Sequence, residues 1–333
     1  KDYIQRIISV EEDKFSHTID QGSLLLEEEI DKLKKEGSRI LTGEVVFKLY
    51  DTFGFPVELT SEILKEKGCD LDEEGFKQLM KHQKEMARAA RKSMDTDGWN
   101  EDSIYLGDFE PTVFIGYDTL KDSAEVVAII SGGKLVDKIG AGESASILLD
   151  RTPFYAESGG QVTDTGVLFK DGLRANVIHV GKHNHVILHK IECLSGELHL
   201  GDTVTAEVNL NKRHGAARNH TSTHILHEAL KRVVGEHVGQ AGSYVTADAL
   251  RFDFTHFEPV TTQQLSEVEN MVNSKILEFL PVQVRELPIE EARKTGAAAQ
   301  FGEKYGDIVR VVSVGDFSNE FCGGTHVKNA GQI

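Results

Sequence analysis

Residues 218–227 read RNHTSTHILH, and this stretch decides how the last part of the chain folds. His220 and His224 stand four positions apart, which places both imidazoles on one face of a helix, one turn apart. Two ligands of one metal ion require this arrangement. Ile225 and Leu226 begin an apolar stripe that would anchor the helix. Taken alone, the pair is more typical of ordinary surface or core histidines than of a metal site.

A second segment, FCGGTH at residues 321–326, supplies a thiolate and another imidazole. Cys322 and His326 are again four positions apart, and the two glycines between them let the backbone turn closely around an ion. Three histidines and one cysteine suit tetrahedral zinc better than magnesium or calcium, which prefer oxygen ligands. We therefore predict a Zn²⁺ site formed by His220, His224, Cys322 and His326.

A metallopeptidase site or a disulfide framework fits these residues less well. A zincin-type peptidase needs a glutamate directly after the first histidine, and Thr221 stands there instead. Cys69 and Cys193 lack histidine neighbours of this kind, so we expect ordinary buried thiols. An odd set of only three cysteines does not indicate disulfides and favours a reducing compartment.

The composition, with 39% hydrophobic residues among 333 and a net charge of -17, is that of a globular protein that we expect in the cytoplasm. This acidity argues against a protein that coats nucleic acid nonspecifically, although a local basic face can still bind phosphates. No apolar run reaches the roughly 18 residues of a membrane helix, and the first residues are not followed by the apolar region of a signal peptide. The chain lacks an initial methionine and ends just after a motif, so we expect a piece of a longer protein.

Three regions of different pattern follow one another. Residues 1–97 show helical spacing of apolar residues, with a break at residues 52–56 where proline and glycine oppose a helix. Residues 98–210 contain short β-rich runs separated by glycines, a pattern that suggests a small barrel. Residues 211–333 mix helices and strands. The expected fold class is α+β: an N-terminal helical region, a small β-barrel and then an α+β zinc-binding domain.

The expected helices cover residues 43–50, 57–67, 72–92, 211–233, 261–279 and a turn or more from about 288. The expected strands cover residues 112–117, 125–130, 145–149, 175–180, 185–191, 203–208, 244–254, 282–287 and 308–314.

Four segments together resemble the alanyl-tRNA synthetases and the free-standing relatives of their editing domain. The two metal segments match the editing domain, and FYAESGGQ at residues 154–161 is similar to its glycine-rich strip. LYDTFGFP at residues 49–56 is similar to a signature of the tRNA-recognition region upstream of it. The order of the segments agrees with the family. No class II activation core is found, so the ligase active site is expected outside this chain, and the editing domain looks cut short.

The resemblance implies hydrolysis of the ester bond in tRNA(Ala) mischarged with serine or glycine. A pocket that selects a methyl group rejects a slightly larger or smaller side chain poorly, so a second hydrolytic site removes the errors. This second site must not hydrolyse the correct alanine ester. The motifs contain no nucleophilic serine and no evident general base, so we expect direct hydrolysis by water, with zinc orienting the substrate.

Two residues are the expected catalytic or selective groups, by resemblance. Thr221 would discriminate against alanine, because a buried polar group left unpaired by a methyl costs about 1–3 kcal/mol; the alternative is a threonine that only packs. Gln240 would bind the substrate ester or the terminal adenosine. Without the family, Gln240 is a polar residue in a glycine-rich turn.

The helical region resembles the part that reads a G·U pair in the acceptor stem. Minor-groove edges are accessible in A-form RNA, and a carboxylate accepts from an exocyclic amino group, so Asp51 is the expected reader. The alternative is that Asp51 caps the turn before Gly54. Arg88 and Arg91 belong to a basic helix end that either faces phosphates or is an ordinary solvated surface.

Two other functions remain open on sequence grounds. In a tRNA-binding module, zinc would only stabilise the fold. A general zinc esterase would act without RNA, which the helical signature around Asp51 disfavours. We expect tRNA(Ala) as the partner, with no membrane and no stable protein partner.

Overall fold

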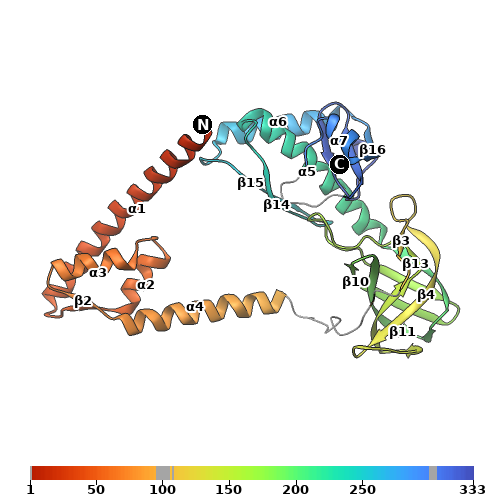
Figure 1. The fold of residues 1–333 in the computed structure, drawn as a ribbon, viewed down its shortest axis with the longest axis horizontal. Helices are drawn as coiled ribbons and strands as arrows, with labels where there is room; N and C mark the ends of the chain where they lie inside the picture. Colours follow the sequence, from red (N-terminus) through yellow and green to blue (C-terminus); the bar gives the residue numbers. More distant parts are fainter. Residues whose placement is uncertain (1, 95–105, 107–108, 300–305) are drawn as a thin grey trace. The chain divides into compact units, whose positions relative to one another are not determined.

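The computed structural model describes the backbone of residues 2–94, 106, 109–299 and 306–333, and the side chains of the same ranges except residues 2, 3 and 87–94. The chain divides into two compact units, Lys1–Gly98 and Trp99–Ile333 (Figure 1). Each unit has its own hydrophobic core. No helix in these described ranges is long and apolar enough to cross a membrane.

The first unit is helical in the part that the structure describes. Its elements are α1 (Asp2–Lys35), β1 (Ile40–Leu41), α2 (Gly43–Asp51), α3 (Val57–Glu66), β2 (Asp70–Leu71) and α4 (Glu73–Met94), with β1 and β2 paired in parallel. The predicted break lies between α2 and α3, where Gly54 takes a positive φ of 69° that closes the helix. The next residue, Phe55, is fully buried against Gly22 of α1, where a Cβ would meet its ring at 2.0 Å.

The second unit begins with a closed six-stranded barrel. Its strands are β4 (Lys121–Ser131), β7 (Ser144–Leu149), β9 (Gly166–Lys170), β10 (Leu173–His183), β11 (Val186–Ser195) and β13 (Thr203–Val208). They pair in the order β13-β9-β10-β11-β7-β4, and β4 pairs back to β13, so the sheet closes on itself. The same region contains short additional strands: β3 (Val113–Phe114), β5 (Lys134–Leu135), β6 (Lys138–Gly140), β8 (Arg151–Thr152) and β12 (Glu197–His199).

Alternation of apolar residues explains the barrel. Ile147, Leu149 and Val204 are among the side chains that fill its interior. Strand β7 is buried on both faces, because Leu148 belongs to a second apolar cluster on the other side of the sheet, together with Leu188. A barrel of this size is filled by side chains, so it forms a rigid support for the elements that follow it.

His189 is a fully buried polar residue of the barrel. Its Nε2 lies 2.7 Å from the Thr152 hydroxyl, and its Nδ1 lies 3.4 Å from the carbonyl oxygen of Ile147. Burial lowers the pKa of His189 from 6.5 to about 4. The ring is therefore neutral in the folded protein at pH 5, whereas it is largely protonated in the unfolded chain.

We expect this histidine to weaken the barrel in acid. Because folding lowers the pKa of His189, its contribution to the free energy of unfolding is fully present above about pH 6.5 and is lost as the pH falls toward 4. The loss is about 2 kcal/mol at pH 5. Urea unfolding followed by circular dichroism measures this effect. His189→Gln should be less stable near pH 7, but its stability should fall less between about pH 7 and pH 5. Equal losses in the two proteins would contradict the assignment.

The rest of the second unit is α+β. Its elements are α5 (Leu210–Val234), β14 (Gln240–Val245), β15 (Leu250–Phe254), α6 (Thr262–Leu277), β16 (Val282–Pro288), α7 (Ile289–Lys294), β17 (Ile308–Val314), β18 (Ser318–Phe321) and the 3₁₀ turn η2 (Ala330–Gln332). Strands β16, β17 and β18 form an antiparallel sheet. Ile225, Leu230 and Val268 belong to the core between α5 and its neighbours.

The predicted α+β class, with N-terminal helices and a small barrel, is confirmed. The helices expected at residues 211–233 and 261–279 correspond to α5 and α6. The strand-forming segment expected at residues 244–254 belongs to a hairpin, in which residues 246–249 form a turn between β14 and β15. Strand β18 was not expected, and it is the strand that leads into Cys322.

Candidate metal centre

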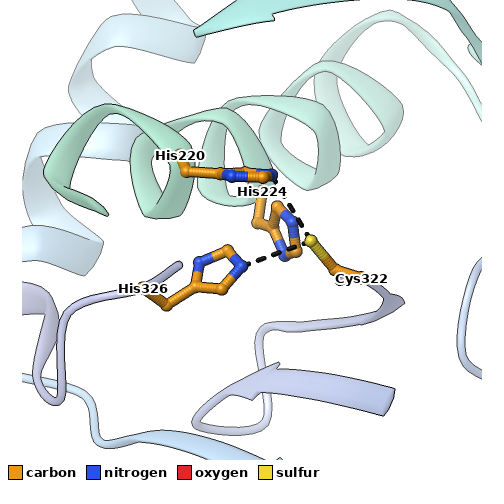
Figure 2. A group of neighbouring side chains, drawn as sticks. All are labelled: His220, His224, Cys322 and His326. Carbon is orange, nitrogen blue, oxygen red and sulfur yellow. Dashed lines mark hydrogen bonds between the residues drawn. The ribbon is translucent and has the colours of Figure 1, made fainter. Parts of the chain in front are cut away.

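Helix α5 carries the first two candidate ligands. It begins after Asn209, whose side chain accepts a hydrogen bond from the Lys212 amide at 3.1 Å and so caps the helix. His220 and His224 are buried on the same face of α5, and Figure 2 shows their rings one turn apart. The spacing of the sequence motif therefore has the geometry expected for it.

The loop after β18 carries the other two. Cys322 and His326 reach toward the α5 histidines from this loop (Figure 2). Arg310 of β17 donates hydrogen bonds to the carbonyl oxygens of Cys322 and Gly324, at 3.1 and 2.6 Å. A Cβ on Gly324 would meet the His220 ring at 1.9 Å, so only glycine lets the loop approach the helix this closely.

The four side chains form one compact group. One ligand atom from each of His220, His224, Cys322 and His326 lies within 4.8 Å of the other three. The Cys322 Sγ lies 3.3 Å from the Nε2 atoms of both His220 and His326. Ligands of a tetrahedral zinc stand about 3.3–3.8 Å apart, given Zn–N and Zn–S bonds of about 2.0 and 2.3 Å. The donor set and the two distances from Cys322 to the histidines therefore fit a zinc site.

The barrel side of the unit orients His220. Gln161, at the end of the FYAESGGQ strip, is fully buried, and its Oε1 accepts from His220 Nδ1 at 2.8 Å. The same oxygen accepts from the Thr325 amide at 2.9 Å. With its proton held at Nδ1, His220 directs the Nε2 lone pair toward Cys322. The sequence motif contained Gln161, but its contact with His220 was not predicted.

Thr221 orients His326 in the same manner. It is fully buried, and its hydroxyl donates to the Ala217 carbonyl oxygen at 2.9 Å. The same oxygen lies 3.0 Å from His326 Nδ1 and accepts from the Val327 amide at 3.3 Å. One donor and two acceptor positions are all that a hydroxyl offers. Thr221 therefore contacts the candidate ligand His326 directly, and its hydroxyl has no hydrogen-bonding position left.

A buried carboxylate supports the third histidine. Glu320 of β18 lies 2.9 Å from His227 Nδ1 and 3.7 Å from His224 Nε2. A carboxylate that contacts a ligating imidazole is a common way to fix the ring and raise its basicity. The buried Nδ1 of His224 has no hydrogen-bond partner among the residues described, so this ring has bonding capacity left over. Neither Glu320 nor His227 was predicted as a site residue.

The electrostatics of the group favour a thiolate. Burial alone would raise the pKa of Cys322, but the surrounding imidazoles of His220, His326 and His224 outweigh burial and hold it well below its ordinary value. Burial lowers the pKa of His326 to about 3, with further lowering by His220 and His224, although the Cys322 charge opposes it. Burial would lower the pKa of His224, but the charges of Glu320 and Cys322 outweigh burial and raise it to about 9. A metal ion that binds this ring must therefore displace its proton, whereas the Cys322 thiolate is ready to bind.

Gln240 lies on the first strand of the hairpin, β14. Its Nε2 donates to the Ser243 hydroxyl at 3.1 Å, and no hydrogen bond to the four-residue group is found within the described ranges. The end of this strand touches the strip that carries Gln161, because the Val245 amide donates to the Gly160 carbonyl oxygen at 2.7 Å. Gln240 is thus on a strand that borders the metal group, without contacting it.

The predicted tRNA-binding residues lie in the first unit. Asp51 is exposed at the end of α2, and its Oδ1 accepts from Gln83 Nε2 of α4. Gly54 is bonded to the Tyr50 carbonyl oxygen, so the turn before it closes without the Asp51 carboxylate. Arg88 and Arg91 lie in α4, and their side chains are outside the described residues.

Comparisons with known proteins agree along the chain. The family described as "tRNA synthetases class II (A)" matches residues 1–212, and the "Threonyl and Alanyl tRNA synthetase second additional domain" matches residues 309–333. The alanine–tRNA ligase of Alkaliphilus oremlandii is 50% identical over 100% of this chain, and that of Caldicellulosiruptor saccharolyticus is 49% identical, also over 100%. The alanine–tRNA ligase of Carboxydothermus hydrogenoformans is 48% identical over 98%. The chain spans 38% of the length of each of these relatives.

Proposed function

The chain belongs to the class II (A) tRNA synthetase family and is similar along its whole length to alanine–tRNA ligases, and from this premise we propose that it hydrolyses mischarged tRNA(Ala). Its substrates would be the serine and glycine esters of that tRNA. The compact group of His220, His224, Cys322 and His326 carries the proposal, because Cys322 and His326 lie in the segment that matches the second additional domain.

Zinc is the metal that this group suits best. Three imidazoles and a thiolate are its preferred donors, and the Cys322 Sγ stands at the required distance from the Nε2 atoms of His220 and His326. When bound, zinc would supply a positive charge that orients the aminoacyl ester and stabilises negative charge on the reacting oxygen. Gln161 and Thr221 would hold the proton of His220 and His326 at Nδ1, which keeps both Nε2 atoms available as ligands.

Discrimination against the alanine ester would depend on how rigidly the four candidate ligands are held. We keep Thr221 as the candidate residue for sparing alanine, acting through His326, because its hydroxyl contacts that ring and is buried. Gln240 would bind the ester or the terminal adenosine from β14, after giving up its bond to Ser243. A water molecule would attack the ester carbon directly, and the free amino acid and the tRNA would leave.

Release of labelled amino acid from Ser-, Gly- and Ala-tRNA(Ala) tests this function. The serine and glycine esters should be hydrolysed, and alanine should be spared by a factor of about 10 or more, which corresponds to a difference of about 1.4 kcal/mol between the transition states. Uncharged tRNA(Ala) should compete with the reaction. Absence of competition would instead indicate an esterase that acts without RNA, and absence of any release would indicate a module that only binds tRNA.

The helical unit would recognise the acceptor stem through Asp51. Its carboxylate is exposed and is held by Gln83 across α2 and α4, so it is positioned to accept from a guanine amino group. Arg88 and Arg91 would contribute phosphate contacts from α4. These assignments extend the resemblance of residues 49–56 to the recognition signature.

We expect Asp51→Ala to weaken binding of a G·U acceptor stem by about 1–3 kcal/mol and to change binding of a G·C stem much less. The measurement is the affinity of both stems for the chain at one salt concentration, because phosphate contacts depend on salt. Gln83→Ala, which frees the carboxylate without removing it, serves as the matched control. Equal losses on both stems would remove Asp51 as the reader of the wobble pair.

A further inference from the structure

A divalent metal ion bound to the four candidate ligands would leave one positive charge unbalanced. The Cys322 thiolate is the one anion among these ligands, and the three imidazoles bind a metal in their neutral form. His220 and His224 are buried, and a charge removed from water is strongly destabilised unless an opposite charge lies near it. Arg310 adds a further cation, because its guanidinium is bonded to the loop that carries Cys322. The charges of the group therefore favour a second anion beside it.

Glu320 of β18 is the anion in that position. It is 9% exposed, and its Oε2 lies 3.7 Å from His224 Nε2. This distance is longer than a hydrogen bond, so the carboxylate acts on the ring through its charge. Within the described ranges, Glu320 is the one carboxylate found in contact with a candidate ligand. Its negative charge is therefore placed where the metal group lacks one.

His227 of α5 holds this carboxylate in place. Its Nδ1 lies 2.9 Å from Glu320 Oε1, and a carboxylate can only accept, so the ring donates this hydrogen bond. No other side chain in the described part of the chain donates to Glu320. The ring is itself fixed, because it is 8% exposed and its centroid lies 5.2 Å from that of Phe252 on β15. A rigid donor on α5 thus sets the direction of the carboxylate on β18.

The second nitrogen of His227 shows that the ring does more than fill space. Its Nε2 is buried and has no hydrogen-bond partner among the described residues. A buried polar atom without a partner lowers stability, whereas an apolar ring of similar size would leave no such atom. A residue that served packing alone would therefore be better as phenylalanine. The hydrogen bond to Glu320 is the contact that accounts for a histidine at this position.

We propose that Glu320 supplies the balancing charge of the metal centre and that His227 is the positioning residue that holds Glu320. The inference rests on the metal centre of the proposed function and adds two residues that are not among its four ligands. Their role differs from that of Gln161 and Thr221, which contact the Nδ1 atoms of His220 and His326 and carry no charge. Affinity for a metal ion then depends on the charge of the ion as well as on its ligands.

The variant Glu320→Gln tests the balancing charge, because it keeps the size of the side chain and an acceptor oxygen. The dissociation constant for Zn²⁺, measured by competition with a chelator, should rise about 10–100-fold, the usual effect of losing an outer-shell partner. The dissociation constant for Cu⁺, measured in the same way without oxygen, should rise less than about threefold, because a monovalent ion and one thiolate already balance. Equal losses for the two ions would show a purely structural role and overturn the proposal.

Two substitutions of His227 test the positioning role. His227→Phe keeps the ring contact with Phe252 but removes the donor, and the dissociation constant for Zn²⁺ should rise about tenfold. His227→Asn places an amide donor near the position of Nδ1 and should restore the affinity to within about threefold of the unaltered chain. An unchanged Zn²⁺ affinity in His227→Phe would remove His227 from this role.

Glu228→Gln is the matched control. It removes a carboxylate from the same helix, where Glu228 pairs with Arg232 at 2.8 Å and contacts no candidate ligand within the described residues. Its Zn²⁺ affinity should stay within about twofold of the unaltered chain, because an exposed pair is screened by water. A loss as large as that of Glu320→Gln would show that any negative charge on these elements suffices, which would contradict the assignment.

These affinities are measured without tRNA, so the test is separate from the proposed hydrolysis. If serine release is absent while Glu320→Gln weakens the binding of Zn²⁺ far more than that of Cu⁺, the proposed hydrolysis fails and the inference holds. If the unaltered chain binds no zinc, both fail. If serine is released and Glu320→Gln binds Zn²⁺ as tightly as the unaltered chain, the inference alone is overturned.

Discussion

Replacing Cys322 with alanine is expected to abolish zinc binding and to slow serine release from Ser-tRNA(Ala) at least about 100-fold, which is the upper range for loss of an outer-shell partner. Cys322 is the one sulfur donor in the group, and its Sγ lies 3.3 Å from two of the imidazoles. Without the thiolate, the three histidines lose the one anion that lies 3.3 Å from both His220 and His326, and only Glu320 remains beside His224. Zinc content per chain and the absorption of the cobalt-substituted protein, whose thiolate band should disappear, measure the effect independently of activity.

Cys193→Ala is the matched control for this variant. Its thiol is buried in the barrel, where the Sγ donates to the Ser195 carbonyl oxygen, and it contacts none of the four candidate ligands. This variant should keep its zinc and its rate. Full zinc content and an unchanged rate in Cys322→Ala would show that the group is not the metal site.

Replacing Arg213 with alanine is expected to lower the free energy of unfolding of the second unit by about 3–5 kcal/mol. Arg213 is 3% exposed and donates to the Asp164 carboxylate, to the Gly116 carbonyl oxygen at 2.5 Å and to the Pro153 carbonyl oxygen at 2.8 Å. These contacts join the first turn of α5 to the barrel. Alanine would leave Asp164 as a buried carboxylate without its cation, which is the main source of the loss.

The double variant Asp164→Leu/Arg213→Met separates two effects: the destabilisation caused by an unpaired Asp164 carboxylate and the stabilisation that the intact ion pair provides. Because apolar residues of similar volume often replace a buried ion pair with little loss, it should recover part of the stability lost by Arg213→Ala. The recovery is incomplete, because the Gly116 and Pro153 carbonyl oxygens and the Tyr155 amide lose these partners. Urea unfolding of the three proteins at one pH gives the comparison. A loss below about 1 kcal/mol in Arg213→Ala would show that the pair does not connect the barrel to α5 energetically.

Local patterns predicted the helices well, including the common helix face of the two candidate ligands on α5. The i, i+4 spacing of His220 and His224 defines a common helix face, and the break at Gly54 follows from its backbone freedom. The turn of the hairpin β14–β15 was not predicted within its strand-forming segment, because periodicity alone does not reveal a turn without proline or glycine at residues 246–249. The closure of the barrel, through pairing of β4 with β13, depends on residues distant in sequence.

Sequence patterns could not predict the hydrogen bonds that hold the metal group, because these bonds also join residues distant in sequence. Gln161 and His220 are 59 positions apart, and Gln161 and Thr325 are 164 apart. Glu320 contacts His227 over 93 positions. Such contacts arise only when the barrel, α5 and β18 have assembled. The one available signal was the presence of polar residues in otherwise apolar segments, as at His227 within the stripe of α5.

The most direct test of a zinc-dependent hydrolytic centre is the rate of serine release from Ser-tRNA(Ala) by the zinc-free chain, before and after zinc is restored. We predict that the folded, zinc-free chain is nearly inactive, that one zinc per chain restores hydrolysis, and that Ala-tRNA(Ala) is hydrolysed at least about tenfold more slowly than Ser-tRNA(Ala). Equal release with and without zinc, or no release by a folded chain that carries one zinc, would contradict the claim that His220, His224, Cys322 and His326 form the hydrolytic centre.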